Sequence, residues 1–334
     1  MPSLYVVEQG AKVHKENRRL VVTKEEQVLQ SIPLIKLEQV LLFGNISITT
    51  PTLAWLMSQN IDVVFCDQQG RFKGRVVGSA SGHSQLRRLQ YRRVESHPFA
   101  LKTARAIVRA KLQNSRTLLL RYQRQRQQPK LAAAAERLGE LMGRVERVQT
   151  VNSLMGVEGV GAAVYFEALP LLLKHDHWQF SKRVRRPPTD PVNVLLSFGY
   201  TLLTRELEAA VERVGLDPYL GCLHADSYNR PSLALDLAEE FRAIVVDSVV
   251  LRCLNSELIG PANFSTQPNP ERPVLLDDDG RNRFIREFEA RLAVTFSHPA
   301  SQEKATYRRC FDLQAREMAR AMQAGNQYRP FVVR

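Results

Sequence analysis

The feature that most constrains the fold is a change of hydrophobic period near residue 82. Before it, short apolar runs are separated by glycines, which is typical of strands and turns. After it, apolar residues recur every three or four positions, as expected for helices. The expected strands are Leu4–Val7, Leu20–Val22, Ile32–Pro33, Val40–Phe43, Val63–Phe65 and Phe72–Val77. Thr50 and Pro51 are a good N-cap and first residue for one intervening helix.

The pattern predicts an α+β chain of two domains, with a boundary between residues 82 and 90. A small β-rich domain covers residues 1–84, and a larger all-α domain covers residues 85–334. The length of 334 residues suits two domains that each bury a core. We expect the helical domain to carry the candidate site residues.

Positive charge is concentrated in one part of the chain. The 47 Lys and Arg against 34 Asp and Glu give a net charge of +13, which favours a polyanionic partner over an acidic small molecule. The segment from Arg87 to Lys130 holds thirteen Lys and Arg and the single acid Glu95. It is either a phosphate-binding face or a solvated basic helix surface. The candidate DNA-binding residues are Arg87, Arg88, Arg92, Arg93, Lys182, Arg183, Arg185 and Arg186.

The cysteines and the apolar segments favour a cytoplasmic protein. The four cysteines lie far apart without a C-x-x-C pair, which argues against a zinc cluster or a disulfide framework. The first fifteen residues lack the apolar stretch of a secretory signal. The sequence also lacks an uncharged apolar run of about 18 residues, so we expect no membrane span.

One acid lies in an apolar, glycine-rich helix at residues 152–173. Glu158 shares a helical face with Tyr165 and Phe166, so its carboxylate is expected to point into a packed interior. A buried carboxylate needs a partner. That partner is either one of the many arginines or a metal ion.

A second group of polar residues falls between residues 221 and 242. His224 lies in a turn-like segment ahead of Ser232, a plausible N-cap for a long helix that carries Asp236 and Glu239 on one face. Each residue has an ordinary reading, as a hydrogen-bonded core histidine or as solvated helix charges near Arg242. Together, one imidazole and two or three carboxylates suit Mg²⁺ or Mn²⁺.

Three motifs resemble one family, the CRISPR-associated adaptation integrase/endonuclease, which is the universal spacer-acquisition subunit. They are LMGVEGVGAAVYF at 154–166, RRPPTDPVNVLLSFGY at 185–200 and GCLHADSYNRPSLALDLAEEFR at 221–242. Further similar segments are Leu4–Val22, Val40–Thr50, Leu276–Leu292 and Tyr328–Phe331, so the resemblance covers the whole chain.

The resemblance implies a catalytic divalent ion, Mg²⁺ or Mn²⁺, held by Glu158, His224 and Glu239. Many members have Asp at the third position, so Asp236 is either a direct ligand or a residue that supports the ligands from behind. The resemblance also implies a homodimer formed through the β domains and a complex with the small ferredoxin-like second adaptation protein. The implied activity is cleavage of double-stranded DNA and joining of its 3′ ends to the CRISPR repeat, in prokaryotic antiviral defence.

Two other functions fit the same residues. A non-catalytic DNA-binding subunit would keep the basic surfaces and use the acids for structure. A branched-DNA repair nuclease would keep the ion and act on a different substrate. Metal-dependent joining of a duplex to repeat DNA distinguishes both from an integrase.

Overall fold

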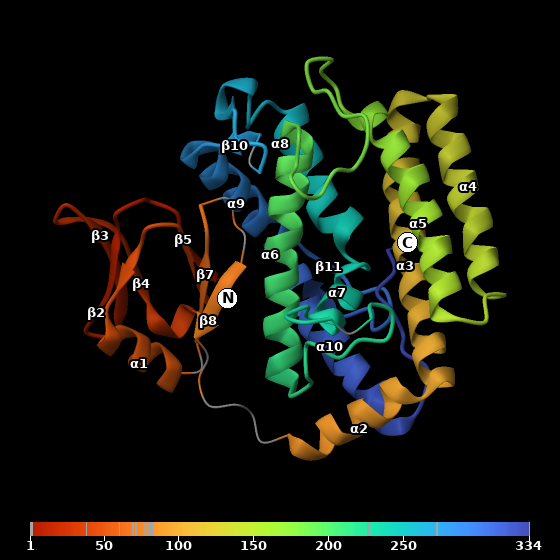
Figure 1. The fold of residues 1–334 in the computed structure, drawn as a ribbon, viewed down its shortest axis with the longest axis horizontal. Coiled ribbons are helices and arrows are strands. Elements are labelled where there is room, and N and C mark those ends of the chain that lie inside the picture. The colour runs from red at the N-terminus through yellow and green to blue at the C-terminus, as the bar shows by residue number, and fades with distance from the viewer. Residues whose placement is uncertain are drawn as a thin grey trace.

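The chain folds into a β-rich N-terminal part beside a larger helical part (Figure 1). The computed structural model describes residues 3–333 except residues 38, 60, 69, 71, 77, 79–82, 226 and 272. The predicted α+β class is confirmed, with strands gathered at the N-terminus and helices after them. The division after residue 84 stays a prediction, since residues 79–82 lie outside the described residues.

Among its described residues, the N-terminal part forms two four-stranded sheets, the helix α1 and a short 3-10 turn at Leu34–Lys36. The first sheet has the order β1-β5-β7-β8, and the second has the order β4-β3-β2-β6. The strands are β1 Ser3–Val6, β2 Lys12–Glu16, β3 Arg19–Lys24, β4 Gln27–Pro33, β5 Gln39–Phe43, β6 Ser47–Ile48, β7 Asp62–Cys66 and β8 Phe72–Val76, and the helix is α1 Thr50–Ser58. The predicted strand end at Val77 lies outside the described residues.

The first sheet is buried on both faces. Val40 and Leu42 of β5 pack in a small core with residues of the second sheet, whereas Leu41 and Phe43 pack in the large core of the helical part. Successive side chains of a strand point to opposite faces, so one strand serves both cores. The continuous apolar run of β5 therefore reflects burial on two sides.

The helical part holds the long helices and two short hairpins. The helices are α2 Ser84–Glu95, α3 His97–Arg126, α4 Pro129–Val145, α5 Val151–Ala168, α6 Pro191–Val214, α7 Ser232–Ala238, α8 Ser248–Asn255, α9 Asp278–Ala293 and α10 Tyr307–Ala324. The hairpins pair β9 Phe264–Thr266 with β10 Val274–Leu276, and β11 Thr295–Ser297 with β12 Lys304–Thr306. The prediction of an all-α second domain therefore misses two three-residue strand pairs.

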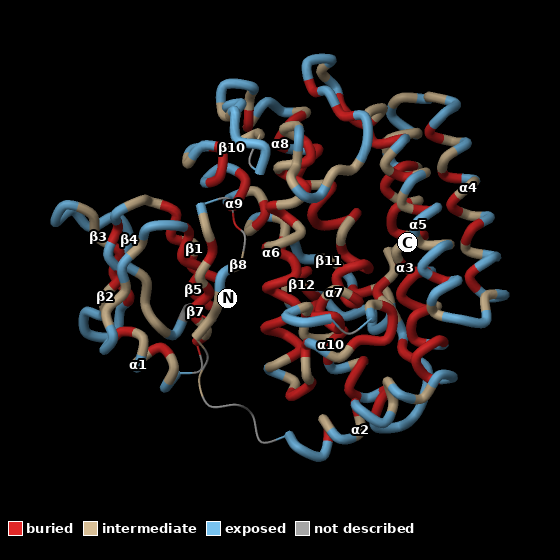
Figure 2. Tube along the Cα trace, in the orientation of Figure 1, coloured by how far each residue is buried: buried red, intermediate tan, exposed pale blue. Residues whose placement is uncertain are grey.

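Helix α6 lies at the centre of the molecule and is buried along most of its length (Figure 2). Phe198 of α6 contacts Phe43 of the first sheet at a ring-centroid distance of 5.9 Å. On its other side it contacts Phe284 of α9 at 5.5 Å. Since aromatic side chains bury large areas, this stack joins the sheet, α6 and α9 into one core.

Buried charges also connect α6 to the first sheet. Ser3 Oγ donates to Glu206 Oε1 at 2.5 Å, and Tyr5 Oη donates to Glu289 Oε1 at 2.8 Å. Arg308 of α10 contacts both Glu206 and Glu289. Burial alone would raise the pKa of Glu206, but Arg308 outweighs it, so that this pKa falls below its usual value.

Helix α5 is long and apolar enough to meet the length and composition test for a membrane span, over Val151–Leu172. Buried helices of soluble proteins pass the same test. Here α5 packs against α3 and α4, and Gly161 lies so close to Leu112 that an added Cβ would meet its side chain at 2.3 Å. The expectation of no membrane span stays a prediction.

The buried charge network gives a stability prediction. Arg308→Met leaves Glu206 buried without its guanidinium partner, so the free energy of unfolding should fall by about 3–5 kcal/mol. Urea unfolding at neutral pH measures the change. Arg309→Met is the matched control, because the Arg309 side chain is 56% exposed, and its effect should stay within about 0.5 kcal/mol. Equal losses in the two variants would contradict the role given to Arg308.

Candidate active site

The site begins with a buried carboxylate that holds a loop. Asp236 of α7 is completely buried and accepts hydrogen bonds from the backbone N–H groups of Cys222, Leu223 and His224 at 2.6, 2.9 and 3.0 Å. Its Oδ1 also lies 2.7 Å from His224 Nδ1. Asp236 therefore fixes the backbone at His224 and leaves Nε2 as the free ring nitrogen.

The close approach of this loop to α7 explains why residue 221 is a glycine. A Cβ at Gly221 would lie 2.7 Å from Asp236 Oδ2 and 2.8 Å from the backbone carbon of Ser232. Those atoms belong to a buried side chain and to backbone, so moving them apart would disrupt close packing. Gly221 is thus required for the contact that positions His224.

Two acids from different helices meet at one lysine. Glu158 of α5 pairs with Lys111 of α3 through its Oε1. Glu239, directly after α7, has its Oε2 2.6 Å from Lys111 Nζ. The three side chains are 22%, 12% and 6% exposed for Glu158, Lys111 and Glu239, so the contact is largely screened from water. The sequence left an arginine or a metal ion open as the partner of Glu158, and the structure pairs it with a lysine.

His224 and Arg242 complete the surroundings of Glu239. His224 Nε2 lies 3.9 Å from Glu239 Oε1, and Arg242 Nε lies 3.1 Å from the same oxygen. Burial would raise the pKa of Glu239, but Arg242, Lys111 and His224 together hold it well below its usual range. Glu239 is therefore ionised despite its burial.

A second buried acid, Asp247, is linked to Arg242 through Tyr200. Asp247 accepts hydrogen bonds at 2.7 Å from Tyr165 and from Tyr200. The Arg242 guanidinium lies over the Tyr200 ring, 4.4 Å from its centroid. Burial raises the pKa of Asp247 to about 6, although the two tyrosines act in the opposite direction. The two tyrosines are buried or half-buried, and both line a narrow cavity that Lys111 and Arg242 also line.

The helix that carries the acids is shorter than expected. α7 ends at Ala238, and residues Arg242–Asp247 form a π-helical turn before α8. Ser232 is the first residue of α7 instead of its N-cap, and its hydroxyl donates to the carbonyl oxygen of Ala225 at 3.2 Å. Such π turns re-aim side chains and are frequent at functional sites. Apolar periodicity does not distinguish this turn from a continuous helix.

The predicted DNA-binding residues divide into two groups. One group is hydrogen-bonded to backbone carbonyl oxygens and therefore helps to hold the fold. Its members are Arg87, Arg93 and Arg183, which donate to the carbonyl oxygens of Gly215, Met322 and Val184 respectively. The remaining candidates are exposed, namely Arg88, Arg92, Lys182, Arg185 and Arg186.

A hollow leads from this basic loop towards the acids. A pocket of about 440 Å³ is lined by Lys182 and Arg185. Through Ala162, Phe166 and Arg185 it adjoins a narrow cavity that is also lined by Lys111 and Arg242. The exposed cations of the loop therefore line the same depression as Lys111 and Arg242, which contact the acids.

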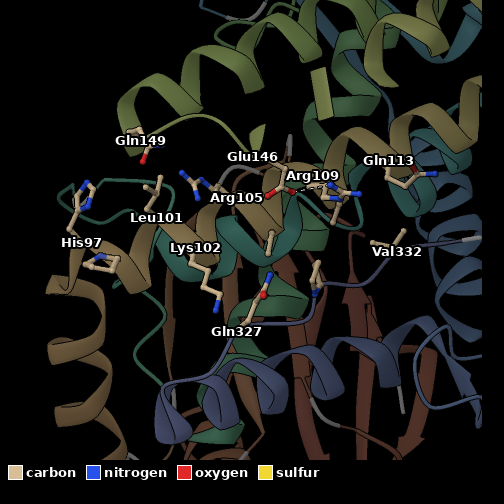
Figure 3. Close-up of a pocket in the computed structure, with 14 residues that line it drawn as sticks. His97, Leu101, Lys102, Arg105, Arg109, Gln113, Glu146, Gln149, Gln327 and Val332 are labelled. Carbon is tan, nitrogen blue, oxygen red and sulfur yellow. Dashed lines mark hydrogen bonds and ion pairs between the residues drawn. The ribbon is translucent and has the colours of Figure 1, made fainter. Parts of the chain in front are cut away.

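A wider groove, of about 860 Å³, lies elsewhere (Figure 3). It runs between α3, the end of α4 and the C-terminal segment, and Lys102, Arg105 and Arg109 line it. Arg109 pairs with Glu146 at 2.9 Å, and Arg105 donates to the carbonyl oxygen of Val148. None of the predicted metal ligands lines this groove, so the groove and the predicted ligands lie apart.

The predicted ligand set fits a divalent ion in its chemistry. Glu158 and Glu239 supply oxygens, His224 supplies a free nitrogen, and Glu239 Oε2 is buried without a hydrogen bond of good geometry. As the side chains lie, no three His, Cys, Asp or Glu side chains within the described residues form a group that could hold a metal ion. The Lys111 ammonium stands between the two carboxylates.

Sequence reasoning missed Lys111, although a signal existed. Lys111 continues the buried stripe of α3 that includes Ala104, Ile107 and Val108. A lysine on the apolar face of a helix needs a buried counter-charge, and two acids provide it.

Comparison with known proteins identifies the family. Residues 4–290 match the family described as CRISPR associated protein Cas1. The chain is 34% identical over 334 residues to a CRISPR-associated endonuclease Cas1 of Thermus thermophilus, with 99% of this chain and 97% of that protein covered. It is 36% identical over 327 residues to a Cas4 exonuclease/Cas1 endonuclease fusion of Geobacter sulfurreducens. That match covers 95% of this chain but 57% of the fusion, so the chain spans little more than half of that relative.

Solved structures agree in fold. A chain of a Cas6-RT-Cas1–Cas2 complex matches with a TM-score of 0.83 and 27% identity, over 99% of this chain and 36% of that one. A Cas1 protein from Thermotoga maritima matches with a TM-score of 0.83 and 24% identity, over 98% of both chains. The family match spans the N-terminal strands and the segments that carry Glu158, His224 and Glu239. The chain therefore belongs to the CRISPR-associated protein Cas1 family.

Proposed function

We propose that this chain is a metal-dependent DNA endonuclease and integrase of CRISPR spacer acquisition, acting in prokaryotic antiviral defence. One observation carries the proposal: Glu158 and Glu239 converge on a single cation position, and His224 is held beside them by Asp236. The curated relatives named as Cas1 endonucleases support nuclease activity.

Glu158, His224 and Glu239 would hold one Mg²⁺ or Mn²⁺. When bound, that ion neutralises charge that develops on the phosphate and orients the attacking oxygen. Arg242 fixes the Glu239 carboxylate from the opposite side, at 3.1 Å. Asp236 would act through His224, because its two carboxylate oxygens are hydrogen-bonded to the loop at residues 222–224.

In the proposed reaction, the 3′-hydroxyl oxygen of a captured double-stranded DNA attacks a phosphate at the repeat boundary. A new phosphorus–oxygen bond forms, the repeat's own bond from phosphorus to its 3′ oxygen breaks, and the proton lost by the attacking hydroxyl is balanced by one gained by the leaving 3′ oxygen. Water in place of the hydroxyl gives cleavage. The DNA would enter along the depression lined by Lys182 and Arg185, which ends near Lys111 and Arg242.

The β-rich part supports a proposed homodimer. Strand β4 is the edge of the second sheet, and Val28 and Leu29 on it are 62% and 44% exposed. Ile35, just beyond it, is 95% exposed. An edge strand with exposed apolar side chains is a natural pairing surface. The name of the matched Cas6-RT-Cas1–Cas2 complex supports the small second adaptation protein as a further partner.

The ligand assignment predicts loss of joining and of cleavage. Glu158→Ala and His224→Ala should each reduce both activities to background in Mg²⁺ or Mn²⁺, because each removes an ion ligand. The measurement is joining of a labelled duplex to a plasmid that carries the CRISPR repeat, with and without the second adaptation protein. Glu140→Ala, an acid with a 62% exposed side chain on α4, is the control and should retain activity. Full residual activity in either variant would overturn the assignment.

The role of Asp236 predicts a weaker effect than removal of a ligand. Asp236→Asn places an NH₂ group against N–H donors, so His224 should lose its fixed orientation. Mn²⁺ affinity should fall by about 10–100-fold, as for other residues that orient a metal ligand. Isothermal titration calorimetry measures it, with circular dichroism as the check on folding. Unchanged affinity would remove the positioning role, and the exposed Asp176→Asn variant is the control.

The proposed DNA path predicts a change in salt dependence. Lys182→Ala and Arg185→Ala should each reduce the slope of log affinity against log salt by about 0.9 for duplex DNA, because each removes one phosphate contact. Fluorescence anisotropy at several salt concentrations gives the slope. Arg320→Ala is the control, since its side chain is 67% exposed on α10, away from the loop in sequence. Slopes unchanged in both loop variants would mean that the loop is only solvated.

A further inference from the structure

The centre of the site is filled by a cation that belongs to the chain itself. Lys111 Nζ pairs with Glu158 Oε1 and lies 2.6 Å from Glu239 Oε2. These are the two carboxylates to which the proposed function assigns the divalent ion. The Lys111 side chain is 12% exposed, so water does little to screen the contact.

The backbone on either side of this contact is fixed. Asn114, one turn beyond Lys111 on α3, donates to the carbonyl oxygen of Glu240 at 2.7 Å and to that of Phe331 at 2.9 Å. Phe331 N–H in turn donates to Glu240 Oε2 at 2.7 Å. The segment that carries Glu239 is thus held against α3, so the position of Lys111 can change by side-chain rotation without a shift of that backbone.

Charge balance requires a cation at this position. Two carboxylates in a poorly solvated site repel each other, and the repulsion is stronger than in water. The Lys111 ammonium relieves it without a metal ion. A divalent ion that used the same oxygens would instead be repelled by a neighbouring ammonium, so both cations cannot hold these positions together.

We propose that Lys111 occupies the ion position of the empty site and competes with the divalent ion for Glu158 and Glu239. Ion binding then displaces the ammonium into the adjoining cavity, which Tyr200 and Arg242 also line. That cavity is narrow, and Asp247, which also lines it, gives the displaced ammonium a new counter-charge. The inference rests on the proposed function, because it takes these two acids as ion ligands.

The test is direct binding of Mn²⁺ to the full chain, measured by isothermal titration calorimetry and by electron paramagnetic resonance of free Mn²⁺. Lys111→Met removes the competing charge, so Mn²⁺ should bind at least about tenfold more tightly than to wild type. Thermal unfolding gives a second readout, in which the variant should differ from wild type in opposite directions without and with the ion. In EDTA the variant should melt below wild type, because the carboxylates lose their counter-charge, and saturating Mn²⁺ should raise its Tm more than that of wild type.

Lys102→Met is the matched control. Lys102 lies on α3 nine residues before Lys111, which places it on the opposite face of the helix, in the groove of Figure 3. The Lys102→Met substitution removes the same charge as Lys111→Met and should leave Mn²⁺ affinity and the Tm in EDTA unchanged. Lys111→Gln, which keeps a hydrogen-bond donor, should shift affinity in the same direction as Lys111→Met and serves if the methionine variant does not fold.

The outcomes separate this inference from the proposed function. Mn²⁺ binding that is lost in Glu158→Ala, together with equal or weaker binding in both Lys111 variants, would overturn the competition and leave the ion site intact. Identical Mn²⁺ binding by wild type and Glu158→Ala would overturn the ion site itself. An equal gain in Lys102→Met would assign the effect to net charge and would also overturn the inference.

Discussion

The burial of α6 is the constraint on which the rest of the structure depends. Phe198 on this helix packs against the first sheet on one side and against α9 on the other. Glu206 on the same helix accepts from Ser3 and pairs with Arg308. Because apolar packing and compensated charge act on one helix, the sheet and the helical part share a continuous core. The loop that follows α6 therefore starts from a fixed point, and this loop delivers His224.

In the site, each buried acid needs a nearby cation or hydrogen-bond donor, because water screens the charges poorly. Glu239 is 6% exposed and remains ionised because Lys111, Arg242 and His224 surround it. Arg242 lies over Tyr200, whose hydroxyl donates to Asp247. Buried charges of this kind persist only when each has a partner. A change in one cation at the centre is consequently felt by every acid around it.

Local sequence signals predicted part of this structure. The alternating or continuous apolar runs gave strands at β5 and β7, and the two-sided burial of β5 explains why its run is unbroken. Lys12–Glu16 was missed because its side chains are mostly exposed and polar, so only its partners β3 and β6 make it a strand. The family motifs located Glu158, His224 and Glu239. The break after α7 and the position of Lys111 depend on contacts between distant segments, which periodicity within one segment does not report.

Contacts between distant segments also favour Glu239 over Asp236 as the third acid of the proposed ligand set. Asp236 lies one turn before Glu239, and both were candidates for contact with the ion. Both oxygens of Asp236 already accept from the loop at residues 222–224, and any withdrawal would free three buried N–H groups. Glu239 lies beyond the end of α7, where its longer side chain spans the distance to Lys111. A shorter acid at 239 would need the backbone closer to α3, so the glutamate follows from where α7 ends.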